Sequence, residues 1–310
     1  MTPFLSAILF IHVLQPPSMP AARPQSPWSY VPQRVYDTRR RAFSDFESML
    51  ADLATADVVF LGEQHDDPGT HRLELAVVEG LTRRRVPLVL ALEMFERDVQ
   101  PLLEQYVAGA ITEERFLAGS RPWPKYASDY RPLVEFAREH QFAVVASNLP
   151  RRIAGTVSKT GMSALDSLGA DRPLAARDAQ CPTSGDYYDR FIEAMGSGHP
   201  PAADDSSAGD PRTRTVRFYL AQCLKDETMG ESIAEAWQQN AARRAVVVHV
   251  NGSFHSDYGE GTAASVARRL AGRRIAVVSF VPVSDIDTRT PSADDTRLGD
   301  FLVYTVKPII

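Results

Sequence analysis

The segment VVFLGEQH, residues 58–65, joins an apolar run to a group of polar side chains. The run 57–61 is short and rich in β-branched and aromatic residues, as in a strand that is buried on both faces. Gly62 then permits a tight change of chain direction, because it has no β-carbon to obstruct one. Glu63 and His65 follow at once. The segment therefore predicts a buried strand whose carboxyl end carries polar side chains.

Segments of the same kind recur and alternate with amphipathic stretches. Strands are predicted at 57–61, 87–92, 142–147, 245–250 and 275–280, with a final edge strand at 301–306. Apolar residues at helical spacing predict helices at 43–54, 70–85, 96–107, 112–119, 131–140, 213–239 and 262–271. Strands joined through helices of this length pair in parallel by right-handed crossovers. The predicted fold class is α/β, a layered α/β/α domain with a mostly parallel central sheet.

Two regions depart from this alternation. Between about residues 155 and 212 no strand is predicted, so we expect a helical excursion there, with a mobile loop at 195–211 because of its Gly, Pro and Ser content. At the N-terminus, residues 4–14 (FLSAILFIHVL) are almost all apolar. A helix needs about 20 residues to span a bilayer, whereas this run has the length of the apolar region of a secretory signal.

We therefore expect a signal peptide at 1–22, a Pro-rich linker at 23–42 and one domain at 43–310. No Lys or Arg precedes the apolar run, so a buried N-terminal strand and a misassigned start codon stay open as alternatives. The expected location is outside the cytoplasm, in the periplasm or at the cell surface, with no membrane span once the signal is removed. No cysteine precedes Cys181, so the chain has no lipoprotein cysteine.

Charge and cysteine content exclude other classes of protein. The chain has 34 basic and 39 acidic residues and a net charge of -5, whereas non-specific nucleic-acid binding needs a basic surplus. The two cysteines, Cys181 and Cys223, could pair in an oxidising compartment. They form neither a disulfide framework nor a CxxC metal site.

The predicted strand ends carry the chemistry. In parallel sheets, ligands bind beyond the carboxyl ends of the strands, where helices begin. The residues that leave these ends are Glu63, His65, Glu93, Asn148 and His255. Two of the strands end in the same G-x-x-H pattern, at 62–65 and 252–255. We therefore predict that both histidines and Glu93 share one rim of the sheet.

Two histidines and two carboxylates support two kinds of chemistry. His65, Glu93 and His255 could ligate a divalent metal. Alternatively, the histidines could act as acid and base without a metal, with Glu63 orienting one of them. A third alternative is that His65 and His255 only cap helices. The spacing from His65 to His71 does not suit two ligands on one helix turn, so His71 is predicted to lie on a helix surface. His249, inside a strand, is predicted to be a core residue.

Several blocks resemble a known family, the haem-binding uptake (ChaN-like) proteins of the Tiki/TraB superfamily, which are more distantly related to erythromycin esterases. The blocks are VVFLGEQHDDPGTH (58–71), ALEMFERDVQPLL (91–103), RPWPKYASDYRPLVEFAREH (121–140), ASNLPRRIA (146–154), AQCLKDETMGESIA (221–234) and VVHVNGSFHSDYGEGT (247–262). The resemblance covers roughly 58–280. Its pattern of two GxxH motifs and a strand-end glutamate falls on His65, His255 and Glu93.

The resemblance implies two activities. ChaN-like members bind haem for iron acquisition, at a dimer interface and through a tyrosine ligand, so haem and a second copy of the chain are expected partners. Tiki and TraB relatives are metal-dependent proteases, and the esterases hydrolyse a macrolide lactone.

For haem, the expected axial ligands are Tyr187 and Tyr188, just before the predicted loop. Packing of these two aromatics at a helix start is the alternative. Three other tyrosines are reserves: Tyr126, Tyr130 and Tyr258. His255 is an expected cofactor contact. Arg151 and Arg152 are expected to meet the propionates or, alternatively, to pair with Glu93 or Glu63.

The function predicted first is haem binding in bacterial iron or haem uptake. The alternative is a metal-dependent hydrolase that uses Glu63, His65, Glu93 and His255. A third hypothesis is a partner-binding domain with an inert site.

Overall fold

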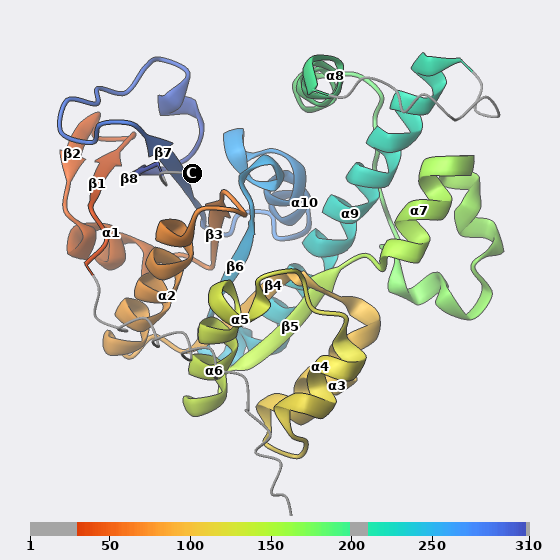
Figure 1. Cartoon of the computed structure of the whole chain (residues 1–310), viewed down its shortest axis with the longest axis horizontal. Coiled ribbons are helices and arrows are strands. Elements are labelled where there is room, and N and C mark those ends of the chain that lie inside the picture. Colours follow the sequence, from red (N-terminus) through yellow and green to blue (C-terminus); the bar gives the residue numbers. More distant parts are fainter. Residues whose placement is uncertain (1–29, 199–209, 308–310) are drawn as a thin grey trace, which may run out of the picture. The chain divides into compact units, whose positions relative to one another are not determined.

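Eight strands form one sheet in the computed structural model, which describes residues 30–198 and 210–307 (Figure 1). They are β1 (Gln33–Asp37), β2 (Ala42–Ser44), β3 (Val58–Glu63), β4 (Leu88–Glu96), β5 (Ala143–Asn148), β6 (Val246–Gly252), β7 (Ile275–Val283) and β8 (Phe301–Val306). Their order across the sheet is β2-β1-β8-β7-β3-β6-β4-β5. The six strands from β8 to β5 are parallel, whereas β1 is antiparallel to both β8 and β2. The predicted α/β class with a mostly parallel sheet is confirmed.

The predicted edge position of 301–306 is wrong. β8 lies inside the sheet because β1 pairs along its other side, from Gln33 opposite Thr305 to Asp37 opposite Phe301. β1 also lies within the range 23–42 that is predicted as a linker, so ordered structure begins before residue 43. Its short sequence, QRVYD, has no apolar run that marks a strand.

Ten α-helices in the described residues connect and cover the strands. They are α1 (Phe46–Leu53), α2 (Pro68–Arg83), α3 (Gln100–Val107), α4 (Glu113–Ser120), α5 (Tyr126–Asp129), α6 (Arg131–Glu139), α7 (Arg151–Thr160), α8 (Asp186–Gly198), α9 (Pro211–Asn240) and α10 (Gly261–Arg269). All seven predicted helices are present, with ends shifted by a few residues. α5, α7 and α8 are additional.

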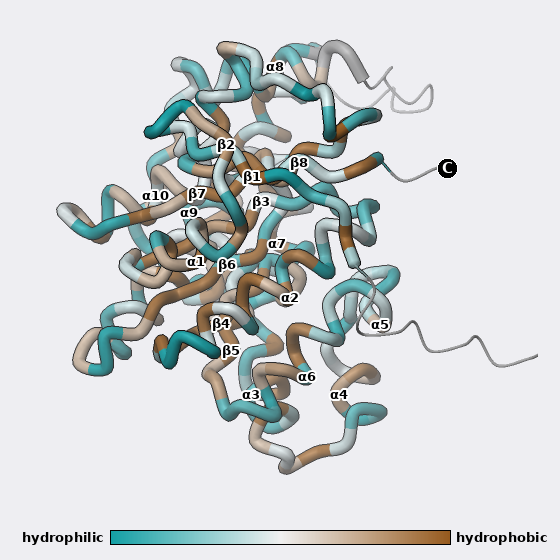
Figure 2. Tube along the Cα trace, turned by 90° about the vertical axis from the view of Figure 1, so that its left-hand side faces the viewer, coloured by the Kyte–Doolittle hydropathy of each residue, from teal (hydrophilic) through white to brown (hydrophobic). Residues whose placement is uncertain are grey.

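Alternate side chains of the central strands build two apolar layers. On one face, Val59 and Leu61 of β3 pack with residues of β4, β6 and β7 against α1 to α6. On the other face, Val58 and Phe60 pack against α9 and α10. Figure 2 shows hydrophobic colouring along the central strands and hydrophilic colouring in many of the surrounding turns. Helices on both faces of a parallel sheet explain why its strands are apolar throughout.

One edge of the sheet, β5, is protected by a side chain. Gln100 of α3 donates to the Val144 carbonyl (2.9 Å) and accepts from the Ala146 amide (2.6 Å). The amide of Gln100 thus takes the place of a neighbouring strand, which blocks pairing with another chain at these positions.

The helical excursion connects α7 to α9 and carries α8. A disulfide joins Cys181, which precedes α8, to Cys223 of α9. The start of α8 is therefore attached covalently to the helix that runs beside the sheet.

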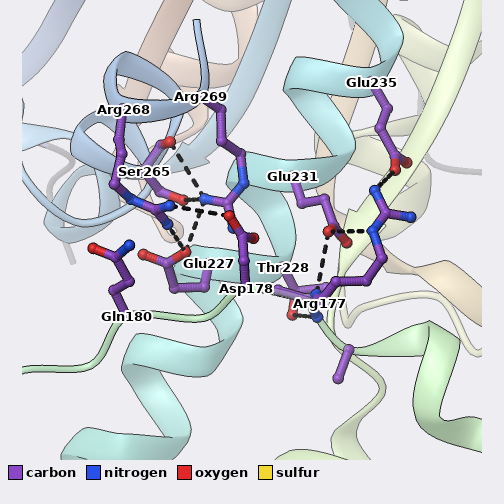
Figure 3. A network of polar contacts seen from close by, with 12 residues as sticks. Arg177, Asp178, Gln180, Glu227, Thr228, Glu231, Glu235, Ser265, Arg268 and Arg269 are labelled. Carbon is purple, nitrogen blue, oxygen red and sulfur yellow. Dashed lines mark hydrogen bonds and ion pairs between the residues drawn. The ribbon is translucent and has the colours of Figure 1, made fainter. Parts of the chain in front are cut away.

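Ion pairs hold the segment before this disulfide against α9 and α10 (Figure 3). Arg177 pairs with Glu231 at 3.2 Å and also with Glu235. Asp178 pairs with Arg268 and Arg269, at 3.1 and 2.5 Å. Because Glu231 is buried, its charge has to be paired there. The network and the disulfide together fix where α8 begins.

Two predictions concern residues outside the described part of the chain. The signal peptide predicted at 1–22 lies there, and so does most of the loop predicted at 195–211, since 199–209 are not described. Within the described ranges, no helix combines the length and apolar character needed to cross a membrane.

Candidate functional site

The carboxyl ends of β3, β6 and β4, which are neighbours in the sheet, bring the two GxxH turns together. The Gly252 amide donates to Glu93 Oε2 (2.7 Å), and His255 Nε2 lies 3.3 Å from Glu93 Oε1. A β-carbon on Gly252 would lie only 2.7 Å from His65 Nε2, so the imidazole of His65 packs directly on that glycine. The prediction of one shared rim is confirmed.

His65 lies on the solvent-exposed side of this rim. Its Nδ1 donates to Glu63 Oε1 (2.5 Å), which also accepts from the hydroxyl of Tyr130 (2.7 Å). The side chain of His65 is 46% exposed, and its ring lies edge-on to Trp123 at 5.1 Å. Burial lowers the pKa of His65, but the hydrogen bond to Glu63 and the charge of Glu93 raise it above its usual range.

His255 forms a second imidazole–carboxylate pair, which is buried. Its Nδ1 donates to Asp226 Oδ1 of α9 (2.6 Å), an oxygen that also accepts from Thr262 (2.8 Å). Gly261 has a φ of +54° and its backbone packs against this pair, where a β-carbon would lie 3.0 Å from Asp226 Oδ1. Burial lowers the pKa of His255, but Glu93 and Asp226 raise it to about 10.

Glu93 lies between the two histidines as an ionised carboxylate. Burial raises its pKa, but the charges of His255 and His65 and the Gly252 amide lower it to about 2. At neutral pH the buried half of the site therefore contains an imidazolium held between two carboxylates, those of Glu93 and Asp226. Such a group can donate a proton or stabilise a negative oxygen, and the exposed His65 can accept a proton when its imidazole is neutral.

The surface position predicted for His71 is wrong. His71 of α2 is 4% exposed, and its Nδ1 lies 3.2 Å from Glu74 Oε2 and 3.3 Å from Glu63 Oε2. α2 starts at Pro68, with Asp67 as its N-cap. This start turns the polar first turn of the helix inward, under the end of β3. Burial lowers the pKa of His71, but hydrogen bonds with Glu63 and Glu74 raise it to about 11.

The predicted metal set is not the group that the geometry favours. In residues 30–198 and 210–307, the group whose ligand atoms all lie within 4.8 Å of one another is Glu63, His71 and Glu74. Glu63 belongs to both arrangements, because its other oxygen holds His65.

Two further predicted positions are structural. His249 is fully buried, as predicted, with Nδ1 3.2 Å from the Ala91 carbonyl, and burial lowers its pKa to about 4. Asn148 donates to the backbone carbonyl of Glu93 (2.9 Å) and accepts from the Leu149 amide (2.8 Å). Asn148 therefore fixes the end of β4 through these two backbone contacts.

The two expected haem ligands lie on α8 beside the buried half of the site. The Tyr187 hydroxyl donates to Asp226 Oδ2 (2.5 Å), so this tyrosine shares a carboxylate with His255. Tyr188 packs edge-on to Tyr219, with ring centres 4.8 Å apart. Phe191 and Phe254 complete an aromatic cluster around Tyr219 and Tyr187, which we call the α8 cluster.

The two arginines do not pair with Glu63 or Glu93. Arg151 Nε lies 3.6 Å from Glu96 Oε1, and Arg152 pairs with Asp98 and Asp171. The predicted alternative of a salt bridge to Glu93 or Glu63 is therefore wrong. Arg151 remains 66% exposed, with its guanidinium 5.9 Å from the ring centre of Trp123.

The three reserve tyrosines differ in position. Tyr126 is buried among aromatic core residues, and Tyr130 is buried with its hydroxyl on Glu63. Tyr258 has a φ of +65°, and its ring centre lies 4.0 Å from the guanidinium carbon of Arg190. It lines a cavity of about 370 Å³ with Arg190 and Phe254, next to the α8 cluster.

Sequence reasoning did not single out four residues of the site, namely Asp226, Trp123, Glu74 and Gln222. Asp226 carried a signal that could have been used. It lies in the block AQCLKDETMGESIA, where the helix predicted at 213–239 has carboxylates close to its apolar face. Gln222, one turn earlier, places Nε2 3.2 Å from His255 Nε2.

Comparisons with known proteins indicate the family of the chain. The model of a family described as haem-binding uptake, Tiki superfamily, ChaN matches residues 49–266. Protein RETICULATA-RELATED 5, chloroplastic, of Arabidopsis thaliana is 28% identical over 271 residues, covering 82% of this chain and 34% of that protein. The chain thus spans about a third of the length of this curated relative.

Two solved structures resemble the chain to different degrees. ChaN of Campylobacter jejuni, solved for its cofacial haem binding, is similar with a TM-score of 0.64 at 16% identity, covering 89% of this chain and 97% of that one. A mutant of the erythromycin esterase EreC in its open conformation gives a TM-score of 0.41 at 17% identity, covering 89% and 83%. With the family model matching more than half of its length, the chain belongs to the haem-binding uptake family of ChaN proteins in the Tiki superfamily.

Proposed function

We propose that this chain binds haem in bacterial iron or haem uptake, outside the cytoplasm, through a tyrosine of α8. The observation that carries the proposal is the α8 cluster, which places two tyrosines and apolar rings beside a polar site. Haem needs an axial ligand, apolar walls and cations for its propionates. When bound, ferric haem supplies an iron centre that a phenolate oxygen can hold.

The residues present fit these needs. Tyr187 and Tyr188 offer phenol oxygens, and Phe191 and Phe254 offer apolar surface. Arg190, which lines the adjoining cavity, and the exposed Arg151 offer positive charge for the propionates. His255 contributes indirectly, since it holds the Asp226 carboxylate that accepts from Tyr187.

Tyr188 is the better ligand of the two. Burial, and then the negative charge of Asp226, raise the pKa of Tyr187 well above its usual range, which disfavours its phenolate. Tyr188 is half-buried, and its ring makes a T-shaped contact with that of Tyr219. We therefore rank Tyr188 before Tyr187, and keep Tyr258 as the reserve.

A ferric haem titration followed by the Soret band tests the proposal. We expect a shifted Soret band for the wild type, a weakened response for Tyr188→Phe and none for the double variant Tyr187→Phe/Tyr188→Phe. Tyr36→Phe is the matched control, since this half-buried tyrosine lies on β1. An unchanged Soret band in the wild type would refute haem binding. A wild-type spectrum from the double variant would refute the choice of ligand.

Haem shared between two copies of the chain is part of the proposal. Light scattering with and without ferric haem tests it. We expect the mass to double when haem is added, and a monomer with haem bound would contradict the shared arrangement.

A second candidate function is hydrolysis, favoured by the two imidazole–carboxylate pairs. His65 would accept a proton from water or a nucleophile, and His255 would donate one or polarise a carbonyl. Glu93, together with Asp226, would keep His255 charged. A panel of peptide and ester substrates, with metal analysis of the same sample, tests this function. Hydrolysis that survives in both His65→Ala and His255→Ala would rule out these residues.

A further inference from the structure

A closed polar site lies behind His65, on the side of Glu63 away from the open rim. It consists of Glu63 at the end of β3 and of His71 and Glu74 in the first turns of α2. Their side chains are 0%, 3% and 0% exposed. Two carboxylates enclosed in this way need positive charge to offset theirs, and a protonated His71 supplies at most one such charge for the two.

The hydrogen bonds of His71 indicate which ring nitrogen faces the carboxylates. Nε2 lies 3.2 Å from the His65 carbonyl oxygen and 3.6 Å from Asp129 Oδ2. Carbonyl and carboxylate oxygens accept hydrogen bonds and do not donate them. Nε2 therefore carries a hydrogen. This is the arrangement by which a metal-binding histidine is usually oriented, with its distal N–H on a carbonyl or carboxylate. Nδ1 then faces the two glutamates.

Unpartnered oxygens complete the case. Glu63 Oε2 and Glu74 Oε1 are buried without any hydrogen-bond partner among the described residues. A proton on His71 Nδ1 could be shared between Glu74 Oε2 at 3.2 Å and Glu63 Oε2 at 3.3 Å, but it would leave Glu74 Oε1 without a partner. A cation bound by Glu63, His71 and Glu74 would give a partner to the buried oxygens of both glutamates at once.

The distances agree with coordination. His71 Nδ1 lies 3.2 Å from Glu74 Oε2 and 3.3 Å from Glu63 Oε2. In a tetrahedral zinc site with bonds near 2.0–2.2 Å, ligand atoms lie about 3.3 Å apart. We propose that Glu63, His71 and Glu74 bind a divalent transition-metal cation such as Zn²⁺, with a water or the second Glu74 oxygen as fourth ligand.

This cation acts on the rim through one shared residue. Glu63 ligates it with Oε2, while Oε1 holds His65 Nδ1 and the Tyr130 hydroxyl. The bound metal thus fixes the carboxylate that positions the exposed imidazole. His65 itself is not a ligand, so the role of the metal is positioning, and it does not depend on whether haem binds.

The first test uses the wild-type protein, stripped with a chelator and then offered Zn²⁺ alone. We expect stoichiometric zinc by mass spectrometry and a higher Tm than the stripped protein. X-ray absorption at the zinc edge should show one imidazole among oxygen ligands. Failure to retain zinc, or a spectrum with two imidazoles, overturns the proposal, because two imidazoles would place the metal on His65 and His255.

Variants locate the site independently of that spectrum. His71→Gln and Glu74→Gln should lose the zinc and the rise in Tm. Glu79→Gln, an exposed glutamate on the same helix, and His255→Gln on the rim should keep both. Zinc lost from His255→Gln but kept by His71→Gln overturns the assignment. If a variant does not fold, the wild-type absorption spectrum still decides between one imidazole and two.

Discussion

The two imidazole–carboxylate pairs have the same sequence motif and opposite environments. His65 on Glu63 is 46% exposed, whereas His255 on Asp226 is 7% exposed. Both histidines follow a strand-end glycine and both donate through Nδ1 to a carboxylate. The difference arises from what covers them. Residues of α9 and α10 pack around His255, whereas the ring of His65 packs on Gly252 and Trp123 and stays partly open to solvent.

This contrast separates stability from ligand access. A buried imidazolium between two carboxylates is held by strong interactions and is costly to disturb. A half-exposed imidazole contributes little to folding but can meet a ligand.

Replacing Asp226 with alanine should have the largest effect. The carboxylate is 2% exposed and accepts from His255, Thr262 and Tyr187. Its removal leaves a buried imidazolium short of one counter-charge, which costs about 3–5 kcal/mol of the free energy of unfolding. Urea denaturation measures this loss, with Asp189→Ala on the exposed side of α8 as control. Equal stability of the two variants would contradict the importance of the buried pair.

The pH dependence of stability should expose part of the same interaction. The pKa of His255 is raised from 6.5 to about 10 in the folded protein, where Glu93, Asp226 and His65 surround it. The contribution of His255 to the free energy of unfolding is therefore complete below about pH 6.5 and is lost as the pH rises towards 10. On the acid side, Glu93 has a pKa lowered from 4.5 to about 2, so its contribution is lost as the pH falls through that range.

The measurement is the free energy of unfolding between pH 6.5 and 10, for the wild type and His255→Gln. We expect the difference between them to shrink as the pH rises. A constant difference across this range would mean that His255 is neutral in the folded protein.

A methyl group at Gly252 should have a smaller effect, confined to the contact between the two GxxH turns. It would lie 2.7 Å from His65 Nε2 and 3.7 Å from Glu93 Oε2, so the imidazole has to move. Overpacking of this kind costs about 1–3 kcal/mol. Gly155→Ala is the control, because a β-carbon there meets nothing within 4 Å. It should leave stability unchanged or raise it by up to about 1 kcal/mol. Similar stability of both variants would show that the turns are not in contact.

The part of this site that sequence could predict is the part built on strands. Apolar runs that end in Glu63, Glu93 and Gly252 predict parallel strands, and parallel strands bring their carboxyl ends to one rim. That geometry follows from the backbone alone. It explains why the sequence predicts His65 and His255 on one rim although they lie 190 positions apart in the chain.

Site residues that lie on helices are harder to predict from sequence, because the first residue and the tilt of a helix decide which of its side chains face the site. His71 was assigned to a surface from its spacing, yet the cap at Asp67 sets the first turn of α2 under β3. Asp226 lies in the middle of a 30-residue helix whose polar residues have no simple periodicity. Side chains that approach a site from helices therefore need the packed structure, whereas those at strand ends do not.

His65→Ala should be the mildest change to stability and so gives the sharpest test of the comparison. The side chain is half-exposed, and Glu63 Oε1 keeps its hydrogen bond from Tyr130 at 2.7 Å when the imidazole is removed. We expect the free energy of unfolding to fall by no more than about 1 kcal/mol, as for most exposed positions. Urea denaturation of His65→Ala and Asp226→Ala under one set of conditions compares the two halves directly. If both lose the same free energy, the open histidine is a structural element like the buried one. If His65→Ala remains stable, its position on the rim is explained by what it binds, because folding does not require it.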